Sequence, residues 1–347
     1  MMGRVRLVAG VLGVVFVVSL RRLLKGRKHP AWSWRMEWLA ETVRHVVLRA
    51  GLDAVAGNRG SGSKQQHQQA TPERELRGGI RWRRAEMAGL RCEIHTPPDW
   101  NEQQPTVLYL HGGGYVALSP ATHRDLVARI AKASGARCVV PNYRKAPKNP
   151  FPAAIDDALA CYRALVDEGV NPERLVVGGD SAGGGLSLAL MLRLREQGES
   201  PPRAAFLLSP WVDLEFTGTS IDTNAPYDYL SRARLEEASG HYLAGHDRRD
   251  PLVSAVFADL TGLPPLLVQT GDAELFYDEN CRLVERARAA QVQVTHEVAP
   301  GMIHVYPVFA PVLEQARQAI ATIGDFVRIQ AGFMEPPKTP SAPTGKI

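Results

Sequence analysis

Short apolar runs alternate with longer amphipathic stretches over most of this chain. Five of the runs are continuously apolar or nearly so, as expected for strands that are buried on both faces of a parallel sheet. Stretches with helical periodicity lie between them, including Pro152 to Val166 and Gly184 to Gln197. The alternation predicts a mostly parallel central sheet flanked by helices. The expected strands are Thr106 to Leu110, Arg137 to Val140, Leu175 to Gly178, Ala205 to Leu208, Leu266 to Gln269 and Val292 to Val298.

Two segments interrupt this pattern. Residues 215–263 are helix-like and contain several aromatic residues, which predicts a cap inserted over the site. Gly57 to Gly79 is polar and glycine-rich, which predicts a linker. We therefore expect a hydrophobic anchor at residues 1–30, a cap helix and linker at 31–80, an α/β domain at 81–330 and a flexible tail at 331–347.

The N-terminus has an apolar run from Leu7 to Leu20, which is shorter than the roughly 20 residues needed to cross a bilayer. A signal peptide, a short anchor and an interfacial helix are all compatible with it. Because no small-residue cleavage site follows, an uncleaved anchor is favoured. Two basic residues precede the run and five follow it, so the positive-inside rule predicts that the globular part lies on the cytoplasmic side.

Trp32, Trp34 and Trp38 follow this basic segment. They suit either an amphipathic helix at the level of the lipid headgroups or a lid that packs over the domain. Composition adds little more. The net charge of +5 is concentrated at the N-terminus, which argues against a nucleic-acid partner and for a membrane surface.

The four cysteines, Cys92, Cys138, Cys161 and Cys281, are widely spaced and are expected to be free, buried thiols. No group of residues has the spacing of metal ligands. We therefore expect neither a metal nor an organic cofactor.

A candidate nucleophile stands in Gly179-Asp180-Ser181-Ala182-Gly183. The motif follows an expected strand and precedes an expected helix, which is the context of a nucleophile elbow. Small residues are needed because helix and strand approach closely there. The Ser181 hydroxyl would then lie at a helix N-terminus, where developing negative charge is favoured.

A second motif, His111-Gly112-Gly113-Gly114-Tyr115, directly follows the first expected buried strand. Its unhindered backbone N–H groups could converge on an oxyanion, which acyl transfer requires. Its histidine is expected to hold this loop by hydrogen bonds rather than to act as a base.

A base and its acid should follow the serine in the order serine, acid, histidine. His304 lies in a loop just after the last expected strand and fits the base, whereas His296 lies inside that strand and is expected to be structural. The loop after Gln269 contains three candidate acids, and the residues alone do not separate them. These are Asp272, Glu274 and Asp278.

Four features together resemble the hormone-sensitive-lipase-like branch of the α/β hydrolases, also called bacterial family IV esterases, over about residues 80 to 330. The resemblance implies the α/β-hydrolase fold with a helical cap. It rests on HGGGY at His111 to Tyr115, YRKAPKNPFPA at Tyr143 to Ala153, GDSAGG at Gly179 to Gly184 and GMIH at Gly301 to His304.

Position by position, the resemblance implies Ser181 as nucleophile and His304 as base. It aligns Glu274 with the acid position, where most of the family has aspartate, and leaves Asp272 as the main rival. It also implies oxyanion donors at Gly113, Gly114 and Ala182, and we predict that Gly112 belongs to the same oxyanion hole.

These residues predict a carboxylesterase or lipase-like serine hydrolase that cleaves short- to medium-chain acyl esters through an acyl-enzyme. A lactone hydrolase with the same triad is the nearest alternative, and a non-catalytic ligand-binding homologue is an alternative of a different class. The expected partners are a small ester and a membrane surface contacted by the N-terminus. A second copy of the chain, in a homodimer, is a further expected partner.

Overall fold

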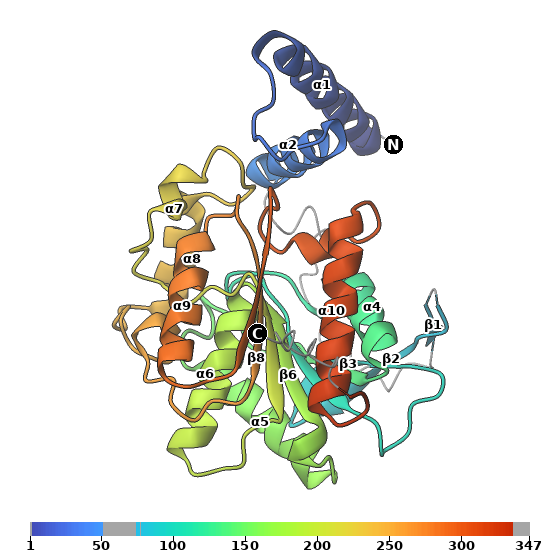
Figure 1. Cartoon of the computed structure of the whole chain (residues 1–347), viewed down its shortest axis with the longest axis vertical. Coiled ribbons are helices and arrows are strands. Elements are labelled where there is room, and N and C mark those ends of the chain that lie inside the picture. Colours follow the sequence, from blue (N-terminus) through green and yellow to red (C-terminus); the bar gives the residue numbers. More distant parts are fainter. Residues whose placement is uncertain (1, 51–73, 77, 336–347) are drawn as a thin grey trace, which may run out of the picture.

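The computed structural model describes residues 2–50, 74–76 and 78–335, with the backbone alone for 2–13 and 48–50. Within them, nine strands form one twisted sheet in the order β1-β2-β3-β5-β4-β6-β7-β8-β9 (Figure 1). From β5 to β9 all neighbours are parallel. These strands are β4 (Thr106–Leu110), β5 (Arg137–Pro141), β6 (Leu175–Asp180), β7 (Ala204–Leu208), β8 (Leu266–Gly271) and β9 (Val294–Ala299).

All six expected strands are therefore present, with ends that differ by no more than two residues. Three further strands were not expected: β1 (Arg74–Glu75), β2 (Arg81–Met87) and β3 (Leu90–Thr96) extend the sheet in antiparallel fashion. The sequence of β2, RWRRAEM, buries only Trp82 and Met87 and lacks the apolar run of an inner strand. Strands near the end of a sheet can be charged in this way because only part of their surface is covered, and β2 is next to the edge strand β1.

Helices cover both faces of the sheet. Alternate residues of each strand point to opposite faces, and in β4 all of them are buried, so both faces need a covering layer. Val107 and Tyr109 of β4 pack with α4 (Arg124–Ser134) and α10 (Glu314–Gln330). Leu108 and Leu110 of the same strand pack with α5 (Ala153–Asp167) and α6 (Ala182–Glu196). Helix α9 (Tyr277–Ala289) joins α6 in covering β7 and β8. Four short 3-10 helices complete the domain: η1 (Pro120–Thr122), η2 (Pro172–Arg174), η3 (Ala255–Phe257) and η4 (Tyr306–Phe309).

The segment between β7 and β8 contains α7 (Ser220–Thr223) and α8 (Arg232–Leu243). It includes the whole stretch that was expected to form a cap. Buried aromatic contacts join it to the domain: the ring of Tyr242 in α8 stacks on Tyr115, with centroids 3.8 Å apart.

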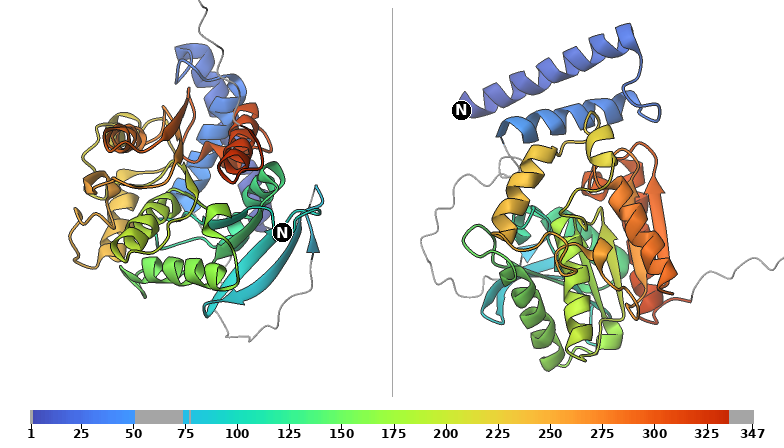
Figure 2. Two further views of the ribbon diagram at one scale, coloured as in Figure 1. Left: turned by 60° about the horizontal axis from the view of Figure 1, so that its bottom comes forward. Right: turned by 90° about the vertical axis from the view of Figure 1, so that its left-hand side faces the viewer.

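The N-terminal helices α1 (Met2–Lys25) and α2 (Trp34–Ala50) lie beside each other at one end of the molecule (Figures 1 and 2). A buried ion pair joins them, with Arg22 Nη1 2.7 Å from Glu37 Oε2. Trp32 packs over the domain: it is fully buried and donates from its indole to the carbonyl of Gly301. By contrast, Trp34 remains 37% exposed.

Two of the predicted segments, the linker and the C-terminal tail, lie partly or wholly outside the described residues. The predicted linker falls mostly on residues 51–73, which lie outside the described residues; its end was placed too late, because Arg74 and Glu75 already pair with β2. The predicted tail lies outside them from residue 336.

Among described residues no helix has the length and apolarity to cross a bilayer. All four cysteines are free thiols, and all but the half-buried Cys281 are buried.

Candidate active site

Three loops with candidate residues lie at one edge of the sheet because they follow the carboxyl ends of three parallel strands, β6, β8 and β9. Ser181 directly follows β6, and Glu274 follows β8 after a short turn. His304 follows β9, at the next position in the sheet. Ser181 and His304, which are 123 positions apart in the sequence, are thereby brought to the same edge of the sheet.

The turn at Ser181 is strained, with φ 54° and ψ −123°, a backbone region that costs of order 1–3 kcal/mol for a residue with a side chain. Two hydrogen bonds hold it: the Ser181 N–H donates to the Leu208 carbonyl at 2.8 Å, and the Trp211 N–H donates to the Ser181 carbonyl at 2.9 Å. The expected need for small residues is confirmed, because a Cβ at Gly183 would lie 1.9 Å from the Leu110 oxygen.

The loop after β4 lies beside this turn. Gly113 and Gly114 have positive φ, at 120° and 63°, and the Gly113 carbonyl accepts hydrogen bonds from Val116 and Ala117. Within the described part of the chain, the N–H groups of Gly113, Gly114 and Ala182 have no acceptor. These three donors are therefore free to bind an oxyanion.

Gly112 differs from the other predicted donors. Its N–H donates to Asp180 Oδ1 at 3.0 Å, and a Cβ at this position would lie 2.3 Å from Asp180 Oδ2. The prediction that Gly112 donates to an oxyanion is therefore corrected, because its N–H group already has an anionic acceptor. Its contact joins the loop after β4 (residues 111–119, here named the oxyanion loop after its proposed role) to the residue before Ser181.

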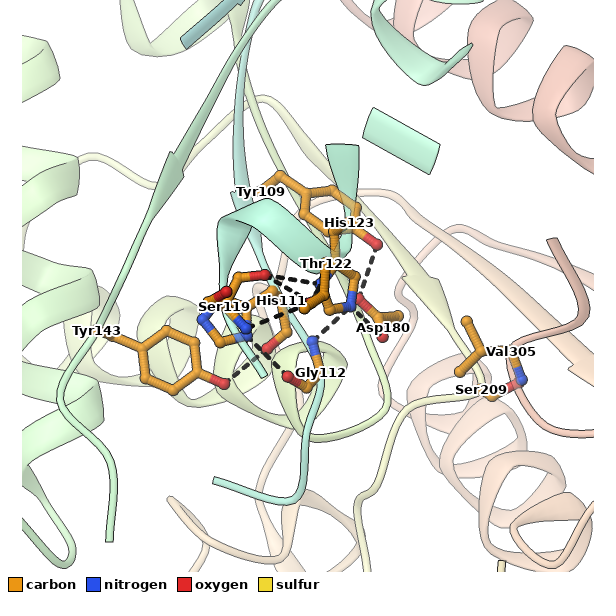
Figure 3. A network of polar contacts seen from close by, with 10 residues as sticks. All are labelled: Tyr109, His111, Gly112, Ser119, Thr122, His123, Tyr143, Asp180, Ser209 and Val305. Carbon is orange, nitrogen blue, oxygen red and sulfur yellow. Dashed lines mark hydrogen bonds and ion pairs between the residues drawn. The ribbon is translucent and has the colours of Figure 1, made fainter. Parts of the chain in front are cut away.

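Asp180 is the centre of a buried polar network (Figure 3). The Tyr109 hydroxyl donates to its Oδ1 at 2.8 Å, and His123 Nε2 lies 3.3 Å from its Oδ2. Burial alone lowers the pKa of His123, but the charge of Asp180 and its hydrogen bond outweigh burial and hold that pKa above its ordinary value. Burial by itself would raise the pKa of Asp180. The charge of His123 and the hydrogen bonds that Asp180 accepts outweigh burial and hold this pKa below its ordinary value.

His111 lies within the oxyanion loop, where its Nδ1 is 2.7 Å from the Gly112 carbonyl oxygen and its ring stacks on Tyr143 at 4.4 Å (Figure 3). The Tyr143 hydroxyl donates to the His111 carbonyl at 2.6 Å. Burial and the nearby His123 hold the pKa of His111 well below its usual range, so the ring is neutral. These contacts are those of a residue that supports the loop.

His304 is 2% exposed and lies edge-on to the ring of Phe276 at 4.9 Å. Burial lowers the pKa of its imidazole to about 3, so the ring is neutral at physiological pH, as a general base must be before it takes a proton. Among described residues its Nδ1 has no hydrogen-bond partner. This is the nitrogen to which a triad acid binds.

Glu274 is fully buried and accepts three hydrogen bonds: from the Ser209 hydroxyl at 2.6 Å, from the Gly271 N–H at 3.0 Å and from the Asn280 amide at 3.1 Å. Burial, assisted by the charge of Asp228, raises its pKa to about 8. In the described chain no hydrogen bond joins Glu274 to His304, or His304 to Ser181. Such contacts are often long in a site without substrate and tighten when it binds.

The two rival acids have other partners. Asp272 is only half-buried, and its Oδ1 accepts a hydrogen bond from the Gly301 N–H at 2.5 Å. Asp278 accepts from the hydroxyl of Thr219 and the N–H of Ser220. Of the three candidates only Glu274 is fully withdrawn from water, as an acid that orients an imidazole should be.

Besides His123, two contributors to this site were missed in the sequence. Ser209 donates to Glu274 and accepts from the Val305 N–H at 2.9 Å. Its hydroxyl therefore joins the loop after β8 (residues 272–276, named the acid loop after its proposed role) to the loop after β9 (residues 300–305, likewise named the base loop). Asp228 accepts hydrogen bonds from the N–H groups of Leu275 and His304. Ser209 could have been suspected as a polar residue at the end of a buried strand, but nothing in the sequence near Asp228 marked it.

Comparison with known proteins agrees with this architecture. A model of the alpha/beta hydrolase fold family matches residues 107–308. The chain is 42% identical over 243 residues to an acetyl-hydrolase of Streptomyces hygroscopicus, covering 69% of this chain and 81% of that one. It is 37% identical over 222 residues to an esterase of Acinetobacter venetianus, covering 63% and 73% of the two chains.

Solved structures are also similar. A crystal structure of an esterase from the bacterial hormone-sensitive lipase family is 37% identical, with a TM-score of 0.73, and the match covers 93% of this chain and 99% of that one. A homologue of hormone-sensitive lipase from a metagenome library has 33% identity and a TM-score of 0.75, with 85% and 98% covered.

The Asp180–His123 pair should make stability depend on pH. Because the folded pKa of His123 is raised, its contribution is fully present below its unfolded pKa and is lost as pH rises through the folded value. We expect His123→Gln to lower the free energy of unfolding by about 1–3 kcal/mol at about pH 6 and by less at about pH 9. Urea unfolding of both proteins at the two pH values measures this difference.

His296→Gln is the matched control. Burial lowers the pKa of this half-buried histidine, so its removal should not destabilise the protein more at about pH 6 than at about pH 9. A His123→Gln effect that is the same at both pH values would contradict the role assigned to the pair.

Proposed function

The chain belongs to the α/β-hydrolase family, in its hormone-sensitive-lipase-like branch, and we propose that Ser181, Glu274 and His304 form its catalytic triad. It is a serine hydrolase of carboxylic esters, and the reaction of this fold proceeds through an acyl-enzyme. The observation that most supports the assignment is the strained Ser181 beside three N–H groups that have no acceptor within residues 2–50, 74–76 and 78–335.

In the proposed reaction, neutral His304 takes the proton of the Ser181 hydroxyl as its oxygen attacks the ester carbonyl carbon. The carbonyl oxygen becomes negative and is bound by the N–H groups of Gly113, Gly114 and Ala182, and each such donor contributes roughly 3–4 kcal/mol to lowering a barrier of this kind. The proton then passes from His304 to the departing alcohol as the ester C–O bond breaks. Water activated by the same histidine hydrolyses the acyl-enzyme.

Glu274 acts on the histidine rather than on the substrate. As His304 becomes an imidazolium, ionised Glu274 is proposed to accept a hydrogen bond from its Nδ1, which has no other partner among the described residues. Burial disfavours the charged form of each residue when it is alone, raising the pKa of Glu274 to about 8 and lowering that of His304 to about 3. Both charges therefore become favourable only when the two residues pair.

We propose short- to medium-chain acyl groups as substrates. Aromatic side chains lie close behind the oxyanion loop: Tyr115 directly follows Gly114, stacks on Tyr242 and lies 6.1 Å from the ring of Trp211. All three aromatic side chains are buried and closely packed, so they have little freedom to move aside for a longer acyl chain. The acetyl-hydrolase name of one relative favours the same size.

Ser181→Ala removes the nucleophile and should lower kcat for p-nitrophenyl acetate and butyrate by about 10⁴-fold or more. Because the serine side chain accepts no structural hydrogen bond in the described chain, the urea midpoint should change little. Steady-state kinetics and urea unfolding measure both effects. Turnover at the wild-type rate would exclude Ser181 as the nucleophile.

Glu274→Gln and Asp272→Asn separate the two acids. The first should lower kcat by about 10²- to 10⁴-fold, because glutamine cannot stabilise the imidazolium. The second should change kcat by less than about tenfold, because it affects only the hydrogen bond to Gly301. The opposite ranking of the two kcat values would assign the acid to Asp272.

We also propose that α1 contacts an anionic membrane surface from the cytoplasmic side. One side of this helix, the outer face of α1, consists of Phe16, Val17, Leu20, Leu23 and Leu24, which are between 47% and 75% exposed. Their spacing places them on one side of a helix, opposite the contact with α2. Residues 1–36 contain eight basic side chains and no acidic one, which complements anionic lipid headgroups.

The membrane contact can be tested with the full-length chain and sedimented vesicles. Wild-type protein should bind phosphatidylcholine vesicles that contain phosphatidylglycerol and should bind those without it weakly. Leu20→Glu/Leu23→Glu should abolish binding without affecting hydrolysis of p-nitrophenyl butyrate. The control Val312→Glu/Phe333→Glu, which makes the same charge change at residues 61% and 43% exposed elsewhere, should bind normally.

Equal binding by both double variants would overturn the assignment of the outer face of α1. A homodimer that dissociates in Leu20→Glu/Leu23→Glu, without vesicle binding by the wild type, would instead identify a second copy of the chain as its partner. Both outcomes leave the proposed triad unaffected, because activity is measured on a soluble ester.

A further inference from the structure

Asp228 joins three segments that are distant in the sequence. It lies between α7 and α8 and is fully buried. Its Oδ2 accepts from the N–H of Leu275, the residue after Glu274, at 2.9 Å, and its Oδ1 accepts from the N–H of His304 at 3.3 Å. The N–H of Tyr229 donates to Oδ1 at 2.7 Å. One carboxylate thus binds the cap segment, the acid loop and the base loop.

The chemistry of this position calls for a group that only accepts hydrogen bonds. Four backbone N–H groups interact with the carboxylate of Asp228, namely those of Leu275, His304, Tyr229 and Leu230. Each would lose its acceptor if the carboxylate were removed, at about 1–3 kcal/mol for a buried donor. In the described chain no cation pairs with this carboxylate, so burial raises its pKa to about 6 against the opposing effect of the N–H donors. A buried charge held without a counter-ion indicates a function beyond packing.

The groups around Asp228 are those of the proposed triad. Glu274 precedes the Leu275 N–H on the acid loop, and the charge of Asp228 is one of the influences that raise the pKa of Glu274. His304 faces it from the base loop, and the phenol of Tyr229 lies beside the same histidine with ring centroids 5.9 Å apart. Asp180 is a further negative group, and it acts on His304 from the nucleophile turn.

We propose that Asp228 is a positioning residue, which holds the acid loop against the base loop so that Glu274 can pair with Nδ1 of His304 during the reaction. The inference rests on the proposed triad. Asp228 does not touch the substrate in this role. It sets the separation of two loops that carry the acid and the base, and it does so from the cap rather than from the sheet.

The test is Asp228→Asn in the full-length protein. Asparagine has the same shape but replaces one acceptor oxygen by an NH₂ donor, so the N–H of either Leu275 or His304 loses its acceptor. We expect kcat for p-nitrophenyl butyrate to fall by about 10- to 100-fold while KM changes by less than about threefold. The control Asp222→Asn, at an exposed side chain paired with Arg232, should retain wild-type kcat.

A proton NMR measurement separates positioning from a loss of stability. With a trifluoromethyl ketone bound to Ser181, the wild type and Asp222→Asn should show a far-downfield resonance from a proton shared between His304 Nδ1 and Glu274. Asp228→Asn should lose or broaden this resonance. Should Asp228→Asn not fold, Asp228→Ser provides the same test, because its hydroxyl can still accept from the nearby Tyr229 N–H.

The outcomes are distinct. An unchanged kcat, or an intact downfield resonance in the Asp228 variant, would overturn the positioning role while leaving the triad in place. A wild-type complex that lacks the resonance, together with normal turnover by Glu274→Gln, would overturn the proposed triad and this inference with it.

Discussion

Between β6 and α6 the backbone of Ser181 is held in a conformation that residues with side chains rarely adopt, and much of the site depends on how this strain is contained. Hydrogen bonds from Ser181 to Leu208 and from Trp211 to Ser181 fix the turn to the neighbouring strand. Gly183 allows α6 to approach Leu110, which brings the oxyanion loop beside the serine. The tight turn therefore brings Ser181, the N-terminus of α6 and the N–H groups of the proposed oxyanion donors together.

Buried carboxylates organise the remaining polar parts of this site. Asp180 binds the oxyanion loop and His123, Glu274 lies on the acid loop, and Asp228 connects that loop with the base loop. Each is satisfied mainly by N–H and hydroxyl donors, and only Asp180 has a histidine that can compensate its charge. The fold can retain such groups because unpaired donors in the same places would be destabilising.

The N-terminal segment is connected to the same machinery. Trp32 donates to the carbonyl of Gly301, while the N–H of Gly301 donates to Asp272, so the loop that leads to His304 is held from two sides. The part of α1 that carries the outer face is attached to this segment through the Arg22–Glu37 ion pair. Only a few directly bonded residues thus separate the outer face of α1, which we propose contacts lipid, from the loop of the proposed base.

By itself, the sequence determined the parallel strands, the serine turn and the loop positions of His304 and the glycines, because apolar runs and glycine requirements are local properties. It did not reveal β1 to β3, whose charged residues lack the pattern of buried strands, or that the Gly112 N–H is taken by Asp180. Nor did it single out Glu274 from Asp272 without help from a resemblance, or find Asp228, Ser209 and His123. Those features depend on which polar groups meet when distant segments pack, and only the tertiary structure decides such meetings.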